Sequence, residues 1–256
     1  MAYNILGTDV SFYQDAPTTA QRIDFKEMKQ NGVFFTIVRA GQDGRGEDRD
    51  FKYNVVAAHE AGLLVGTYYV INTKSTGTVQ AENYWKIISP YSNIIDLPPV
   101  ADYEYYHWAT PRPSKATAKN MLGAFLLKLQ SLSGKTPMIY TNADTWYQYG
   151  GTDTYFASYP LWQASYSSVP PKPFAPFTKW TFWQFSATGN GQFYGVESKS
   201  IDLNYFYGTL EELYKFCGKI PEVPTPDECC DYCKETRQRL EDLEKKVADM
   251  GADPNS

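Results

Sequence analysis

Short apolar runs alternate with amphipathic runs along the first 150 residues of this chain. Segments 5–12, 34–41 and 63–71 are typical of buried strands, and 22–32 and 50–62 carry apolar residues at helical spacing. Glycines follow both helical segments, where helix C-caps belong. The alternation continues to about residue 150. It predicts roughly five βα units, which form a parallel sheet covered by helices.

The helical pattern changes after residue 150. Segments 160–166, 179–186 and 201–208 are predicted strands between Pro- and Gly-rich turns, and 210–216 is a predicted short helix. Eight strands in one unit imply a closed sheet. We therefore expect an α/β fold, an irregular TIM-like barrel of five βα units plus three further strands. In such barrels the functional side chains gather at the carboxyl ends of the strands.

A change of composition near residue 217 predicts a separate C-terminal part. We expect a catalytic barrel at 1–217, a Pro-rich linker at 218–228 and a short charged helix at 229–256. The helix is a candidate coiled coil, and 229–250 a candidate homo-oligomer interface, because apolar residues are spaced 3, 4 and 3 apart at Leu240, Leu243, Val247 and Met250. A single charged helix or a disordered tail is the open alternative. With about three heptads the segment is marginal alone. Either interchain disulfides through Cys229, Cys230 and Cys233 reinforce it, or it continues in a longer parent chain.

Charge and composition exclude several classes of function. The net charge is −5 and no cluster of Lys and Arg occurs, which argues against nucleic acid as a partner. No run of 18 apolar residues and no signal peptide is present, so we expect no membrane insertion and synthesis without export. His59 and His107 cannot form a zinc site with cysteines far along the chain. No metal and no cofactor are expected, since nucleotide-binding motifs are missing too.

Carboxylates at predicted strand ends are the strongest chemical signal. Asp102 and Glu104 follow an apolar run and, two positions apart, share one face of a strand at about 6–7 Å. Two neighbouring negative charges do not serve packing, and burial should raise one pKa so that an acid persists near neutral pH. Asp9 and Asp202 end or begin other strands, and all four converge only if the sheet closes. For any one Asp, a cap or turn role is the alternative. Glycoside hydrolysis usually uses two such carboxyl groups.

Seven segments carry a more specific signal. Together they resemble, in order over residues 5 to about 216, the signature blocks of the glycoside hydrolase 25 lysozymes. The segments are DVSFYQ, DFKYNVVAAHEAGLLVGTYY, LPPVADYE, PMIYTN, PLWQASY, WTFWQFS and DLNYF. The resemblance implies an irregular barrel, no cofactor, and cleavage of the β-1,4 bond between N-acetylmuramic acid and N-acetylglucosamine.

The resemblance also implies roles for individual residues. Glu104 matches the proton donor. Asp102 matches the partner that steers or stabilises the reacting sugar, and one form of this mechanism uses the sugar's own N-acetyl group. Asp9 and Asp202 match supporting acids. Where the family commonly has a His, this chain has Tyr69, so that position is given no catalytic role. Candidate substrate-binding residues, each with a core role as the alternative, are Arg39, Tyr68, Tyr103, Tyr140, Trp162, Gln163, Trp183 and Gln184.

Three biological settings fit this chemistry. The first is an endolysin that acts on peptidoglycan glycan strands of the bacterial cell wall and that, if phage-encoded, is made in the host cytoplasm. The second is a structural component of a virion or secretion device that pierces the wall locally. The third is a wall-binding module without turnover, which the presence of all four acids argues against.

Overall fold

The computed structural model describes residues 5–16, 18–19, 22–104 and 112–220. Contacts divide the chain into two units, 1–219 and 220–256. The predicted coiled coil, its cysteines and most of the linker lie outside the described residues. Among the described residues, no helix is both long and apolar enough to cross a membrane.

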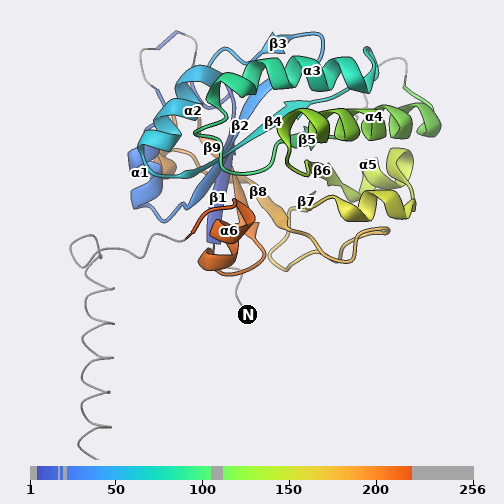
Figure 1. Ribbon diagram of the computed structural model, residues 1–256. Helices are drawn as coiled ribbons and strands as arrows, with labels where there is room; N and C mark the ends of the chain where they lie inside the picture. Colours follow the sequence, from blue (N-terminus) through green and yellow to red (C-terminus); the bar gives the residue numbers. More distant parts are fainter. Residues whose placement is uncertain (1–4, 17, 20–21, 105–111, 221–256) are drawn as a thin grey trace, which may run out of the picture. The chain divides into compact units, whose positions relative to one another are not determined.

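Strands and helices alternate in the order that the sequence predicts (Figure 1). The strands are β1 Ile5–Val10, β2 Phe35–Gln42, β3 Gly46–Glu47, β4 Leu64–Val70, β5 Val100–Asp102, β6 Met138–Asn142, β7 Leu161–Ala164, β8 Phe182–Asn190 and β9 Ser200–Phe206. The α-helices are α1 Phe25–Gln30, α2 Phe51–Glu60, α3 Gly77–Ile88, α4 Lys115–Ser133, α5 Ala143–Thr145 and α6 Leu210–Phe216.

Eight of these strands close into a barrel. Their order is β1-β9-β8-β7-β6-β5-β4-β2, and β2 pairs back with β1. All neighbours are parallel except β9, which runs antiparallel to both β1 and β8. The short β3 extends β2 as a two-stranded ribbon outside the ring. The expected barrel of five βα units plus three strands is confirmed.

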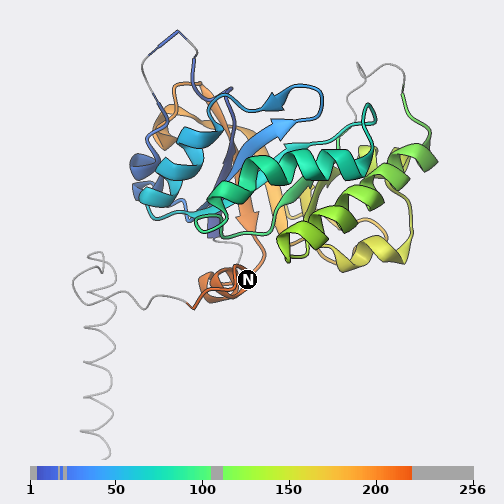
Figure 2. The same cartoon turned by 45° about the horizontal axis from the view of Figure 1, so that its top comes forward.

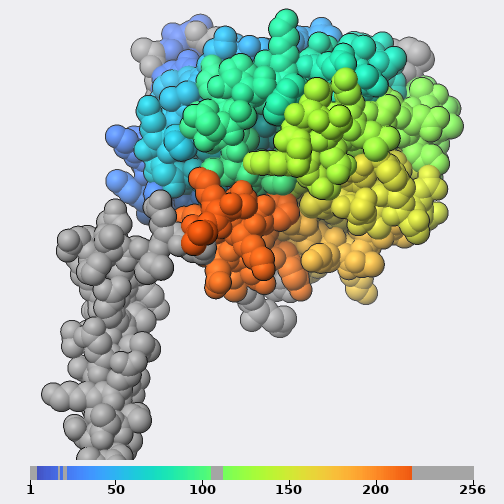
Figure 3. Space-filling view, viewed as in Figure 1, coloured from blue at the N-terminus to red at the C-terminus, as the bar shows by residue number. Residues whose placement is uncertain are grey.

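Helices α2, α3 and α4 cover the outer face of the parallel strands. Figure 2 shows α3 and α4 lying side by side, and Figure 3 shows their side chains forming a continuous surface. Beneath them, the Tyr84 ring stacks on Tyr69 from β4 and on Phe125 from α4. The buried layer between strands and helices is the larger of the two apolar clusters in the described residues.

A second apolar cluster fills the lower half of the barrel interior, toward the amino ends of the parallel strands. Phe35, Phe182 and Phe206 meet there, with ring centroids 5.1 and 5.2 Å apart. Gly7 of β1 lies opposite Phe35, and a Cβ at Gly7 would overlap the Phe35 ring. Glycine therefore allows this ring to fill the space, and the lower half is a packed core rather than a channel.

Candidate active site

All four predicted acids line one pocket at the carboxyl ends of the parallel strands. The pocket has a volume of about 320 Å³. Asp9 comes from β1, Asp102 is the last residue of β5, and Glu104 lies two positions beyond it. Asp202 enters from β9, directly opposite Asp9 in the antiparallel pairing of the two strands. The closed sheet thus brings together acids nearly 200 positions apart.

Two buried amides hold the Asp9 carboxylate. Gln184 Nε2 donates to Asp9 Oδ2 at 2.9 Å, and Asn204 Nδ2 donates to the same oxygen at 2.8 Å. Burial raises the pKa of Asp9 to about 6, while the bonds from Asn204 and Gln184 lower it. Asp9 is therefore a buried acid whose charged form is supported by donors.

Asp202 and Asp102 lack comparable support. Burial, followed by the nearby charge of Asp9, raises the pKa of Asp202 to about 8. Burial also raises the pKa of Asp102 well above its usual range, and the charge of Glu104 adds to this. Among the described residues, Asp102 Oδ1 has no hydrogen-bond partner. The pocket therefore keeps protons on carboxyl groups near neutral pH.

Glu104 is half-buried at the mouth of the pocket. Asn142, the last residue of β6, donates from Nδ2 to Glu104 Oε2 at 3.2 Å. Asn142 also caps the short helix α5, where its Oδ1 accepts a hydrogen bond from the Thr145 backbone N–H, which fixes the orientation of the amide. One amide thus anchors one oxygen of Glu104.

Five of the eight predicted substrate-binding residues line this pocket. They are Arg39, Tyr68, Tyr140, Trp162 and Gln184. Tyr140 and Trp162 lie edge to face with ring centroids 4.5 Å apart. These side chains point inward because they occupy alternate positions on their strands.

The other three, Tyr103, Gln163 and Trp183, lie outside the pocket. Tyr103 is fully buried in the outer layer, where its hydroxyl donates to the Tyr149 carbonyl at 3.0 Å. Gln163 Nε2 donates to the Lys172 carbonyl, and Trp183 Nε1 donates to the Ser165 carbonyl. Each is adjacent in sequence to a residue that lines the pocket. Successive side chains of a strand point to opposite faces, so these three point to the outside of the barrel. We propose no substrate contact for them.

Arg39 lines the pocket but forms its ion pair with an acid outside the group of four. Its Nε donates to Asp48 Oδ2 at 2.8 Å in a buried ion pair, and its guanidinium lies over the Phe12 ring. The charge of Arg39 lowers the pKa of Asp102, but as the smallest of the contributions to that pKa. Arg39 thus pairs with Asp48 rather than with one of the four pocket acids.

Several residues that line the pocket or hydrogen-bond to its acids were not predicted from the sequence. Asn204 lies two positions after Asp202 on β9, so strand alternation from that acid could have identified it. Asn142 ends a strand, as Asp102 does, which is a similar signal. Tyr13 and Tyr166 line the pocket from loops, with 64% and 65% of their surface exposed. Loop residues carry no periodicity from which a face could be predicted.

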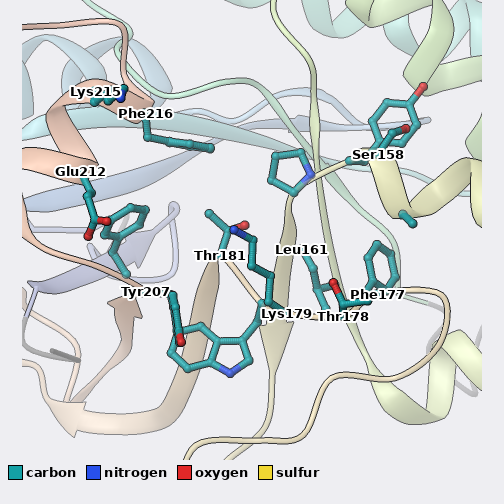
Figure 4. A pocket seen from close by; sticks show the side chains of 15 residues that line it. Ser158, Leu161, Phe177, Thr178, Lys179, Thr181, Tyr207, Glu212, Lys215 and Phe216 are labelled. Carbon is teal, nitrogen blue, oxygen red and sulfur yellow. The ribbon is translucent and has the colours of Figure 1, made fainter. Parts of the chain in front are cut away.

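A second, larger cavity lies at the opposite end of the strands. Its volume is about 460 Å³, and none of the four acids lines it. Figure 4 shows Glu212, Lys215 and Phe216 of α6 on one side of it and Ser158 and Phe177 on the other. Size therefore does not distinguish the candidate active site, but the carboxylates do. Among the described residues, no group of three or more His, Cys, Asp or Glu side chains is arranged to hold a metal ion.

Comparison with known proteins identifies the family. Residues 8–195 match glycosyl hydrolases family 25. The chain is 30% identical to the uncharacterized protein YegX of Escherichia coli strain K12 over 231 residues, 87% of this chain and 77% of YegX. It is 28% identical to Lysozyme M1 of Streptomyces globisporus over 214 residues, 82% of this chain and 70% of that protein. The crystal structure of a bacterial lysozyme from Streptomyces coelicolor is similar with a TM-score of 0.74 and 26% identity, over 85% of this chain and 98% of that one. The protein therefore belongs to glycosyl hydrolases family 25 and is a glycoside hydrolase of the lysozyme type.

Proposed function

We propose that the protein is a muramidase that cleaves the β-1,4 bond between N-acetylmuramic acid and N-acetylglucosamine in peptidoglycan, with Glu104 as the proton donor. The observation that carries this proposal is the meeting of Glu104 with Asp9, Asp102 and Asp202 in one pocket. Family membership supports the substrate class. The similarity to lysozymes supports the position of the bond.

Glu104 fits the role of an acid that later becomes a base. In its protonated form it donates to the oxygen that leaves with one sugar, and the resulting carboxylate accepts a proton from water. The hydrogen bond from Asn142 occupies Glu104 Oε2.

Asp102 fits a role beside the reacting sugar. Its carboxyl is buried, and its Oδ1 has no partner among the described residues. A buried oxygen without a partner is costly, so a substrate donor that reaches it is bound more tightly. The N–H of a sugar N-acetyl group is such a donor. By accepting it, Asp102 would orient the acetyl oxygen toward the carbon at which the bond breaks.

The exposed rings of Tyr13 and Tyr166 suit contacts with sugar faces. Both line the rim of the pocket. Trp162 is only 1% exposed, and its indole Nε1 donates to Asn204 Oδ1 at 2.8 Å. We therefore assign stacking to the two rim tyrosines, and give Trp162 a role in holding the pocket together.

Mass spectrometry of digested peptidoglycan tests the proposal. We expect each new reducing end to be N-acetylmuramic acid. Glu104→Gln preserves shape but cannot donate a proton, so we expect turnover to fall by about 10²- to 10⁴-fold. Circular dichroism and thermal melting should show an intact fold.

Glu82→Gln is the matched control. Glu82 lies on α3, outside the pocket, in a surface ion pair with Lys128 that contributes little to stability. We expect normal turnover from it. Reducing ends at N-acetylglucosamine would reject the proposed bond, and substantial activity in Glu104→Gln would reject the proposed donor.

The setting in which the enzyme meets the wall stays a prediction. We propose lysis of the bacterial cell wall as an endolysin, with a virion-associated lysin as the alternative. The proposed homo-oligomer through 229–250 lies outside the described residues. Measuring the solution mass of the full chain and of a chain ending at residue 218 would test it.

A further inference from the structure

The two amides that hold Asp9 have fixed orientations. An amide group presents either its oxygen or its nitrogen, and only the nitrogen can donate to a carboxylate. The Trp162 indole donates to Asn204 Oδ1 at 2.8 Å. An indole N–H can only donate, so the Asn204 oxygen must face Trp162 and its nitrogen must face Asp9.

Gln184 is oriented by Asp9 itself. A carboxylate can only accept, so the Gln184 nitrogen faces Asp9 Oδ2 at 2.9 Å. Its oxygen then accepts from the hydroxyls of Tyr140 and Tyr166, at 2.7 and 3.2 Å. Two separate chains of donors, one from an indole and one from phenols, therefore end on a single carboxylate oxygen.

This arrangement singles out Asp9 from the acids around it. Asp202 lies opposite Asp9 and is hydrogen-bonded to it, and within the described part of the chain no amide N–H donates to the Asp202 carboxyl. The charged or titratable groups near Asp9 come from β2, β4, β5, β6 and β9 and from the neighbouring loops. They are Tyr13, Arg39, Tyr68, Asp102, Glu104, Tyr140, Tyr166 and Asp202. Of the three aspartates in this set, and as far as the described residues extend, only Asp9 receives two amide N–H groups on one oxygen.

We propose that Asn204 and Gln184 are positioning residues that keep the negative charge of the acid cluster on Asp9 while the proton stays on Asp202. This inference rests on the muramidase proposal. A fixed negative charge in the pocket stabilises the positive charge that develops on the sugar in the transition state. The amides act through Asp9 and need not touch the substrate.

The pH dependence of kcat/KM on soluble peptidoglycan fragments tests the inference. Asn204→Leu and Gln184→Met each remove one N–H from Asp9 while keeping a similar volume. Losing a donor disfavours the charged form, so Asp9 will titrate at a higher pH. We expect the acidic limb of the profile to move up by about one pH unit in each variant. A purely structural role would lower the rate at every pH and leave the limb in place, which would overturn the inference.

Gln163→Met is the matched control for Gln184→Met. Both glutamines are 3% exposed, and they lie on neighbouring strands, but Gln163 donates to the Lys172 carbonyl outside the pocket. We expect its acidic limb to coincide with that of the unmodified protein. An equal shift in the control would mean that any buried amide has this effect, and would reject a special role for Gln184.

A titration of the unmodified protein is a second test, and it does not depend on turnover. Carbon-13 NMR of the aspartate carboxyl groups, assigned with Asp9→Asn, follows Asp9 and Asp202 directly. We expect Asp9 to ionise at the lower pH of the two. If Asp202 ionises first, the inference is wrong, even if the protein is an active muramidase. If Asp9 ionises first but the protein does not cleave peptidoglycan, only the proposed function fails.

Discussion

The two halves of the barrel interior are built from the same strands but hold opposite chemistry. β8 contributes Phe182 to the apolar lower half and Gln184, two positions on, to the acidic pocket. β9 contributes Asp202 to the pocket and Phe206 to the apolar half. Strand alternation therefore decides which side chains face inward, and position along the strand decides whether they pack or react.

The energetics of the halves differ as well. Packing of rings such as Phe35 and Phe182 removes apolar surface from water and stabilises the fold. Burying Asp9, Asp102 and Asp202 close together opposes folding, because each charged form loses hydration and the charges repel. The comparison predicts that substitutions in the apolar lower half mainly reduce stability. Substitutions in the acidic pocket, the upper half of the interior, mainly reduce activity.

The largest stability effect is expected in the lower half. Phe35→Ala empties space that Phe182 and Phe206 cannot fill, and should lower the free energy of unfolding by about 3–5 kcal/mol. Denaturant-induced unfolding measures this loss. At temperatures where the variant is folded, its pH profile of kcat/KM should match that of the unmodified protein, since the pocket acids are untouched.

Leu127→Ala on α4 is the control for that substitution. Leu127 is 58% exposed, so its truncation leaves no internal cavity, and we expect a loss below about 1 kcal/mol. A shifted pH profile in Phe35→Ala would break the comparison, because the halves would then not be separate in function.

Within the upper half, Asp9 and Asp202 should differ although they face each other. Asp9→Asn removes the supported charge, so we expect kcat/KM to fall by about 100-fold. Asp202→Asn resembles a protonated carboxyl and can still donate toward Asp9. Burial and the charge of Asp9 raise the pKa of Asp202 to about 8, so this variant should lose less than about tenfold at pH 6. Steady-state kinetics on soluble fragments compares them, and equal losses would contradict unequal roles.

Much of the barrel could be predicted because its strands and helices have strong local signals. The near-continuous burial of β2 from Phe35 to Gly41 matches the apolar run that predicts a parallel strand. The four acids could be placed together because closure of the sheet leaves them one common end. The ribbon of β2 with Gly46 and Glu47 was not predicted, since two residues are too short for a pattern.

The neighbours of the acids were harder to predict. Tyr103 and Trp183 are candidate substrate-binding residues in the sequence because they are aromatic and close to predicted pocket residues. Each is adjacent in sequence to a residue that faces the pocket, Asp102 or Gln184, so the alternation of side chains along a strand places it on the outer face. Applying alternation strictly would have excluded both and found Asn204 from Asp202. The direction of Arg39 toward Asp48 depends on a loop after β2, and no local pattern of the sequence encodes that pairing.

The smallest expected effect is a gain in stability from neutralising an acid in the upper half. Asp102 has a pKa raised well above its usual range by burial and by the charge of Glu104. A carboxyl whose folded pKa exceeds its unfolded pKa favours folding at low pH and loses that benefit as pH rises toward the folded value. The pKa of Asp9 is raised to about 6 and that of Asp202 to about 8. The cluster should therefore make the protein progressively less stable between about pH 4 and pH 8.

Asp102→Asn should therefore raise the melting temperature, and by more at pH 8 than at pH 4. Each kcal/mol of relief corresponds to about 2–4 °C for a domain of this size. Differential scanning calorimetry across this pH range measures the change. Asp144→Asn, on the exposed surface of α5, makes the same substitution outside the pocket and should show no such pH-dependent gain. A lower melting temperature for Asp102→Asn at pH 8 would mean that the acidic half stabilises the barrel, which is the opposite of the division proposed for its two halves.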